Sequence, residues 1–96
     1  MKVYKLKLYK TYYNQGFFNI PVDYDHLVRR DEGPIEIELA GSSRIIGQVN
    51  RSANQNGTAR IMGRVELRDW FQSWFHEMDN IVVEFLSPEA IRLKPI

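Results

Sequence analysis

The chain has 96 residues, 44% of them hydrophobic and 12% aromatic, and it contains no cysteine. A chain this short needs most of its residues for one core, so we expect a single domain over residues 1–96. Without cysteine it forms neither a disulfide nor a thiolate metal site, and its two histidines are too few for a zinc site. The lack of a long apolar stretch predicts a soluble, intracellular protein of the cytoplasm that does not bind a membrane.

The net charge of +1 is distributed over four segments of alternating sign. Residues 1–16 carry four lysines and no acid, and residues 44–64 carry four arginines and no acid. Residues 17–43 and 65–96 carry net charges of −4 and −3. This distribution predicts two separate basic surfaces on a protein that is almost neutral as a whole.

In the first part of the chain, alternating apolar and charged residues predict a strand over Tyr4–Leu8. The polar residues and glycine of Thr11–Gly16 predict a loop, and the apolar run Phe17–Ile20 predicts a second strand. A proline followed by two aspartates and later by two arginines predicts a short helix over about Pro21–Arg29. Ile35–Leu39 shows the cleanest alternation and predicts a strand whose two glutamates point outward.

The middle of the chain resembles a hairpin with a long tip. Arg44–Val49 predicts a strand, and we interpret its Gly47 as a β-bulge. Asn50–Gly57 is polar and ends in Asn-Gly, the pair that best tolerates the positive φ angles of a tight turn. Thr58–Met62 then predicts the returning strand.

From Val65 onward, apolar residues recur at helical spacing and predict an amphipathic helix. The apolar face of this helix, which we interpret as core, consists of Leu67, Trp70, Phe71, Trp74, Phe75 and Met78. Ile81–Leu86 and Ala90–Leu93 predict the last two strands. This order predicts a mostly β fold: a seven-stranded open pseudobarrel, mixed or antiparallel, with two short helices, of which the aromatic-rich one plugs an end.

The acidic residues offer no convincing catalytic site. The acid cluster consists of Asp23, Asp25, Asp31, Glu36 and Glu38. A metal-dependent nuclease would combine such acids with a nearby lysine, but no lysine lies between Lys10 and Lys94. We interpret the two glutamates as a solvated sheet face, and His26 and His76 as surface or helix-capping residues. The chain is therefore predicted not to be an enzyme and to use no metal or small-molecule cofactor.

Both acid-free basic segments coincide with connections that are rich in amides and hydroxyls. Lysine and arginine neutralise phosphates, while arginine, asparagine and glutamine recognise base edges in the major groove. The residues predicted to bind DNA are Lys7, Lys10, Thr11, Tyr12, Tyr13, Asn14, Gln15, Arg44, Gln48, Asn50, Arg51, Ser52, Asn54, Gln55, Asn56, Thr58 and Arg60. Among these, base edges are assigned to Asn14, Arg51, Asn54 and Gln55, and phosphates to Lys7, Lys10, Arg44 and Arg60.

Three local motifs resemble the DNA-binding pseudobarrel superfamily, which includes the plant B-three-type domain and the effector or recognition domains of bacterial restriction endonucleases. They are Phe18–Pro21 before a short helix, Asp69–Phe71 in an aromatic helix, and Asp79 before the strand Ile81–Phe85. The resemblance implies an open barrel that grips the major groove with two arms and recognises a specific sequence in double-stranded DNA.

By position, the N-arm would be Lys10–Gly16 and the C-arm would be Asn50–Arg60. The family context also implies restriction-modification or gene regulation, with a separate nuclease domain or subunit as a partner.

Two alternatives use the same surfaces differently. A small barrel of this kind could instead be a protein-interaction module. It could also bind single-stranded nucleic acid, with Tyr12, Tyr13 and Phe17 stacking on bases.

Overall fold

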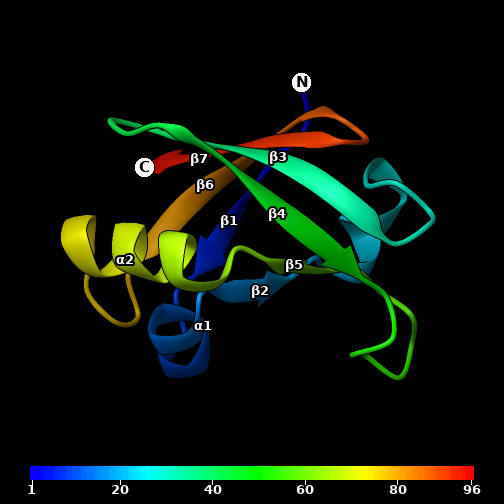
Figure 1. The fold of residues 1–96 in the computed structure, drawn as a ribbon, viewed down its shortest axis with the longest axis horizontal. Helices are drawn as coiled ribbons and strands as arrows, with labels where there is room; N and C mark the ends of the chain where they lie inside the picture. The colour runs from blue at the N-terminus through cyan, green and yellow to red at the C-terminus, as the bar shows by residue number, and fades with distance from the viewer.

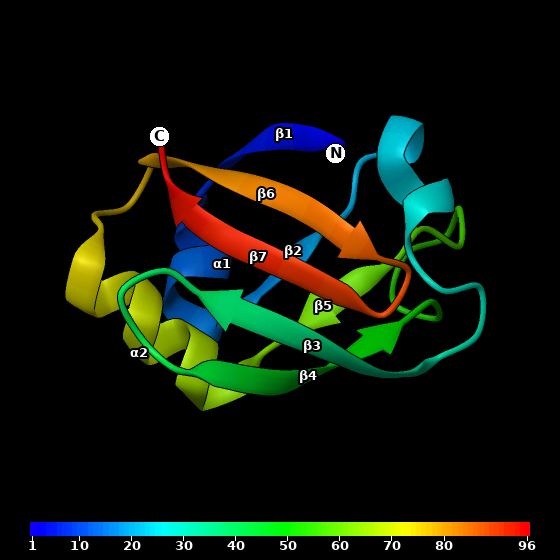
Figure 2. The ribbon, with the colours of Figure 1, turned by 90° about the horizontal axis from the view of Figure 1, so that it is seen from above.

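Seven strands form one mixed sheet that curls into an open half-barrel (Figures 1 and 2) in the computed structural model, which describes residues 1–96. The strands are β1 (Val3–Lys7), β2 (Phe17–Asn19), β3 (Gly33–Leu39), β4 (Arg44–Asn50), β5 (Arg60–Met62), β6 (Asn80–Ser87) and β7 (Ala90–Pro95). Their order across the sheet is β1-β6-β7-β3-β4-β5-β2. Only β3 and β7 pair in parallel, and β1 and β2 are the two edges. The predicted fold class, an open pseudobarrel that is mostly β, is confirmed.

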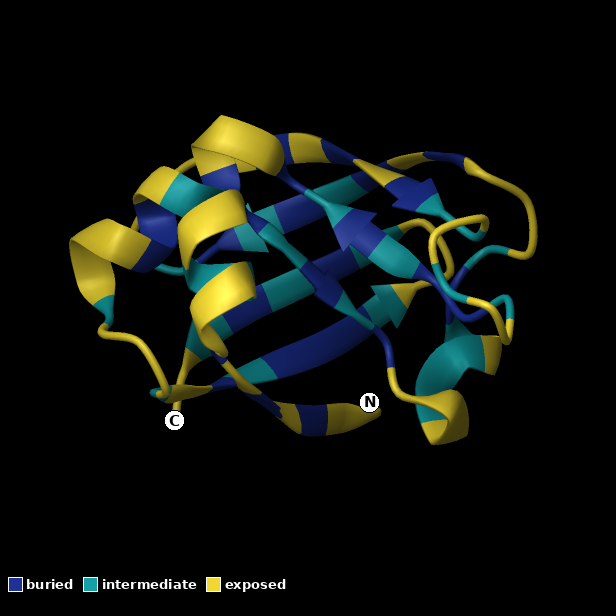
Figure 3. Ribbon diagram, turned by 90° about the horizontal axis from the view of Figure 1, so that it is seen from below, coloured by how far each residue is buried: buried dark blue, intermediate teal, exposed yellow.

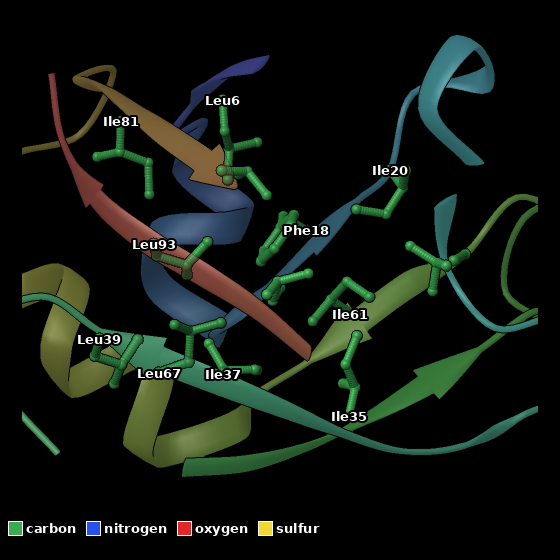
Figure 4. Close-up of a cluster of buried hydrophobic side chains, with 14 of the residues drawn as sticks. Leu6, Phe18, Ile20, Ile35, Ile37, Leu39, Ile61, Leu67, Ile81 and Leu93 are labelled. Carbon is green, nitrogen blue, oxygen red and sulfur yellow. The ribbon is translucent and has the colours of Figure 1, made fainter. Parts of the chain in front are cut away.

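The core forms because alternate residues of each strand point to the same face. In β1, Tyr4 and Leu6 are buried while the lysines between and beside them are exposed, and β3 and β4 repeat this alternation (Figure 3). Figure 4 shows inward side chains from both edge strands within one cluster, among them Leu6 of β1 and Phe18 of β2. A single cluster of 21 buried residues results.

The structure contains two α-helices and one 3₁₀ helix: α1 (Lys10–Gln15), η1 (Val22–Leu27) and α2 (Arg64–Trp74). None of them has the length and hydrophobicity that crossing a bilayer requires. The short helix predicted after Pro21 is present as η1. The predicted loop over Thr11–Gly16 is wrong, because most of this segment belongs to α1. This helix is too short to show a sequence period, and it is stabilised by packing against α2, where the Tyr13 hydroxyl donates to the Phe75 carbonyl over 2.8 Å.

The apolar face predicted for the aromatic helix is only partly core. Its central residues Leu67, Trp70 and Phe71 are buried, but Trp74 is 60% exposed and Met78 is 48% exposed. The helix ends at Trp74, since Phe75 is already extended. The helix therefore ends about one turn earlier than the spacing of apolar residues predicts.

Gly47 also differs from the prediction, because β4 pairs with β3 through this residue without a bulge. A Cβ atom here would lie 2.7 Å from Cδ1 of Ile37 and 2.9 Å from the Met62 carbonyl oxygen. The glycine is explained by close approach of neighbouring chains.

Gly16 ends α1 and contacts the start of α2. Its carbonyl accepts the backbone N–H groups of Gly63 and Arg64, each over 2.9 Å, at the start of α2. Its φ angle is +74°, and a Cβ atom would lie 2.0 Å from the Arg64 carbonyl oxygen. Both the backbone conformation and the close approach therefore require glycine.

Replacing Gly16 with alanine should lower the free energy of unfolding by about 3–5 kcal/mol, because backbone strain and a clash with α2 add together. The matched control is Gly57→Ala, where φ is +76° but nothing lies within 4 Å of the added Cβ. That change should cost only about 1–2 kcal/mol. Urea unfolding measures both values, and equal losses would contradict the role of the α1–α2 contact.

On the outer face of the sheet, Glu84 of β6 lies between two cations of β7. Its carboxylate is 3.0 Å from Lys94 Nζ and 3.1 Å from Arg92 Nη1, and the residue is buried. The hydrogen bond with Lys94, followed by that with Arg92, holds the pKa of Glu84 below its ordinary value. The ionised form is therefore bound more favourably in the folded state than in the unfolded state.

The stabilisation from Glu84 should be present above its unfolded-state pKa of about 4.3 and lost as the pH falls below it. Glu84→Gln should therefore lower stability at pH 7 by about 1–3 kcal/mol. Its stability should also fall less steeply than that of the wild type between about pH 5 and 3. Thermal unfolding over this range checks both effects, and parallel pH profiles would contradict them.

Candidate nucleic-acid interface

The N-arm and the C-arm project on the same side of the half-barrel, with β2 and β5 between them (Figure 1). This placement follows from topology, because the N-arm leads directly into β2 and the C-arm leads directly into β5. These two strands pair antiparallel, so the elements that precede them lie at opposite ends of the pair. Phe17 faces Met62 at the N-arm end, and Asn19 faces Arg60 at the C-arm end.

The outward face of this strand pair lies between the arms. Phe18 and Ile61 point inward and are fully buried. Strand alternation therefore places the other residues on the outer face, which we call the β2–β5 ribbon: Phe17, Asn19, Arg60 and Met62. All four are partly exposed, and none is acidic.

In the N-arm, one side of α1 faces α2, and another side contacts the β2–β5 ribbon. Tyr13 is turned toward α2, and Asn14 bonds to the Lys10 carbonyl and to Gln72. The Tyr12 ring instead packs edge-on against Phe17, with 5.5 Å between ring centroids. The exposed residues without a side-chain partner in the protein are Lys10, Thr11 and Gln15, together with Lys7 at the end of β1.

In the C-arm, the side chain of Arg51 points into the protein. Each of its three nitrogens donates a hydrogen bond: to both oxygens of Asp25, to Gly57 O, and to the carbonyls of Val28 and Arg29. Asp25 Oδ1 also accepts the Ala59 N–H over 2.8 Å. The guanidinium therefore ties the C-arm to η1 and keeps no free edge for a base. The base-reading role expected for Arg51 does not agree with this geometry.

Most other polar side chains of the C-arm close its own turns. Asn50 Oδ1 accepts the N–H groups of Ser52 and Ala53, and Asn56 Oδ1 accepts the N–H and hydroxyl of Thr58. Such bonds are what asparagine contributes to tight turns. Gln55 at the tip and Gln48 on β4 are exposed and have no partner within the protein.

Glu32 is a second acid, besides Asp25, that contacts the start of the C-arm. It accepts the Arg51 N–H over 2.7 Å and the Ser52 hydroxyl over 3.2 Å. These bonds, the Arg51 N–H above all, hold the pKa of Glu32 below its ordinary value. The carboxylate is therefore ionised at neutral pH, and its hydrogen bonds hold the start of the C-arm in place.

Arg60 lies at the end of the ribbon and has no acidic partner. Its Nε donates to Asn19 Oδ1 over 3.0 Å, and its Nη2 donates to Asn54 Oδ1 over 3.4 Å. Asn54 in turn donates to Asn19 over 3.0 Å, which closes a ring of three side chains. The guanidinium carbon lies 4.3 Å from the centre of the Phe17 ring. Asn54 is thus engaged within the protein, like Arg51.

Arg44 is not brought to the arms. It lies at the opposite end of β4 from the C-arm, about 20 Å away along the strand, and pairs with Glu36 over 2.8 Å. The basic side chains that form no ion pair with an acid are Lys2, Lys5, Lys7, Lys10, Arg30, Arg60 and Arg64.

Sequence reasoning missed two contributors to this surface, Asn19 and Arg64, and it named Phe17 only as a stacking ring of the single-strand alternative. Phe17 and Asn19 hold Arg60, and strand alternation over Phe17–Ile20 is the signal that places them outward. Arg64 begins α2 and lines a hollow of about 410 Å³ beside the exposed Gln48 of β4. Its signal is the acid-free segment 44–64, to which it belongs. No group of three or more histidine and acidic side chains lies close enough to hold a metal ion.

Comparisons with models of known protein families, with curated proteins and with solved structures found no match to this chain. Membership of the DNA-binding pseudobarrel superfamily therefore stays a prediction based on the motifs and on the order of the elements.

Arg51→Ala should lower the free energy of unfolding by about 2–3 kcal/mol, because it leaves Asp25 and several buried carbonyls without their donor. Hydrogen exchange should also accelerate across residues 52–58. Arg44→Ala is the control, since its ion pair with Glu36 is exposed and should contribute less than about 1 kcal/mol. Unchanged exchange in the C-arm of Arg51→Ala would contradict the anchoring role.

Proposed function

We propose that this chain binds double-stranded DNA in a sequence-specific manner, with the N-arm and the C-arm entering the major groove on either side of the β2–β5 ribbon. The observation that carries this proposal is the placement of two acid-poor arms at opposite ends of a short ribbon, on one side of the barrel. The major groove of DNA is about 12 Å wide, which is wide enough for an α-helix or a two-stranded ribbon. The predicted resemblance to the DNA-binding pseudobarrel superfamily supports the same function.

The side chains with free donors divide into two roles. Lys7, Lys10 and Arg64 would neutralise phosphates, because they carry unpaired charge around the ribbon. The exposed amides of Gln15, Gln48 and Gln55 would contact base edges. Arg51 and Asn54 would act indirectly, by fixing the shape of the C-arm.

In this function the chain supplies recognition and no chemistry. A separate nuclease domain or subunit would supply DNA cleavage if the chain is the recognition module of a restriction enzyme. As a regulator, the chain would need no such partner. Neither role requires a metal or a small-molecule cofactor on this chain.

Single-strand binding is the second candidate, and one observation favours it. The rings of Tyr9 and Tyr12 are 5.9 Å apart, and Tyr12 continues to Phe17, so that aromatic side chains follow one another from the N-arm onto the ribbon. Aromatic rows of this kind stack on unpaired bases. Tyr13, which the sequence included in this row, is turned toward α2 instead.

Fluorescence anisotropy with labelled duplexes tests the main proposal. We expect duplex affinity to fall as salt rises, with a linear dependence of log affinity on log salt, and a selected sequence to bind more tightly than random sequence. Lys10→Ala should reduce the magnitude of the slope by about 1 for all sequences.

The matched control is Lys2→Ala, which should leave the slope unchanged, since Lys2 precedes β1 and the start of this strand is remote from α1 (Figure 1). A flat salt dependence, or equal affinity for every duplex, would refute specific duplex binding. Displacement of the duplex by an equimolar single strand would favour the second candidate.

A further inference from the structure

Arg60 is held on three sides before any ligand arrives. Asn19 and Asn54 accept hydrogen bonds from its Nε and Nη2 groups, and its guanidinium carbon lies over the ring of Phe17, 4.3 Å from the ring centre. Two of the holding residues, Asn19 and Phe17, come from β2, and Asn54 comes from the C-arm. The three together define one position and one plane for the guanidinium.

The remaining edge of this guanidinium has free donors. Nη1 donates to no acceptor in the protein, and Nη2 has a second N–H beyond the one that points to Asn54. No carboxylate forms an ion pair with Arg60. The free edge is therefore a pair of parallel donors in a fixed plane.

Such an arrangement suits a planar ligand with two adjacent acceptors. A phosphate group can also accept two parallel hydrogen bonds from an arginine, so the modified bases described below distinguish a base edge from a phosphate as the ligand. Guanine presents O6 and N7 side by side in the major groove, and two parallel N–H donors match this pair. Because the side chain is already ordered, binding loses little side-chain entropy.

We propose, on the basis of the duplex-binding function above, that Arg60 is a specificity-determining residue that donates two hydrogen bonds to O6 and N7 of one guanine. This replaces the phosphate contact that the sequence predicted for Arg60. Asn19, Asn54 and Phe17 are positioning residues that hold the donors in the plane of the base.

The experiment compares wild type with Arg60→Lys, a variant that keeps the charge and loses the fork. Duplexes are selected from a random pool with each protein, and affinities for the selected and random duplexes are then measured. Wild type should enrich a site with an invariant guanine. Arg60→Lys should accept any base at that position and bind the selected duplex about 10- to 100-fold more weakly, with a change of less than about twofold on random duplex.

Modified bases in the selected duplex test the contact atom by atom. 7-Deazaguanine lacks the N7 acceptor and should weaken wild-type binding about 10-fold, with little further effect on Arg60→Lys. Inosine keeps O6 and N7 and loses only the minor-groove amino group, so it should bind like guanine.

Asn19→Ala tests the positioning role in a protein that still contains Arg60. It should reduce discrimination for guanine about fivefold, the effect of one lost hydrogen bond. Circular dichroism and thermal unfolding of each variant establish that the fold is retained.

Three outcomes would overturn the assignment. They are an equal weakening of all duplexes by Arg60→Lys, an invariant guanine in the sites that Arg60→Lys selects, and equal wild-type affinity for duplexes with 7-deazaguanine and with guanine. In each of these cases salt-dependent binding of wild type to a selected duplex, tighter than to random duplex, still supports the proposed function. If wild type binds no duplex at all, both proposals are refuted.

Discussion

The contact between Arg51 and Asp25 determines the geometry of the C-arm. The guanidinium crosses from the start of the arm to η1, and the same carboxylate accepts the N–H of Ala59 at the end of the arm. Both ends of the loop are thereby attached to one side chain. Because Ala59 directly precedes Arg60, the contact also sets where β5 begins and where Arg60 meets Asn19. The partly buried ion pair of Arg51 and Asp25 thus helps to fix the position of Arg60, the residue that is proposed to contact DNA.

The N-arm is attached by different means. There the attachment is made by backbone: Gly16 allows the end of α1 to approach the start of α2 so closely that its carbonyl accepts two successive N–H groups. Tyr13 adds a second link to the far end of α2. The two arms therefore depend on separate parts of the molecule, the C-arm on η1 and the N-arm on α2. Changes to one anchor should leave the other arm in place.

The strands could be predicted because burial on one side of a sheet leaves a period of two, as in Tyr4–Leu8 and Ile35–Leu39. The helix over Lys10–Gln15 could not, because it is shorter than two helical turns and its stability comes from α2. The exposure of Trp74 has a different cause: helical spacing shows which residues share a face, and not how far along the helix the rest of the protein covers that face. The two acid-free segments could be found in the sequence, since charge and composition are local properties, and their role as arms stays a prediction. The inward direction of Arg51 depends on Asp25, a partner that no local pattern reveals.

The pairing of β1 with β6 links the two ends of the sequence, since Val3 faces Glu84. The parallel pairing of β3 with β7 also waits for residues near the C-terminus, because Leu39 faces Leu93. During folding β1 therefore has no partner until residues 80–84 of β6 are available to pair with it. Contacts so distant in sequence slow folding, and an unpaired strand invites association with other chains. The lysines of β1 alternate with its buried residues and place charge on this edge strand, and such charge disfavours pairing with other chains.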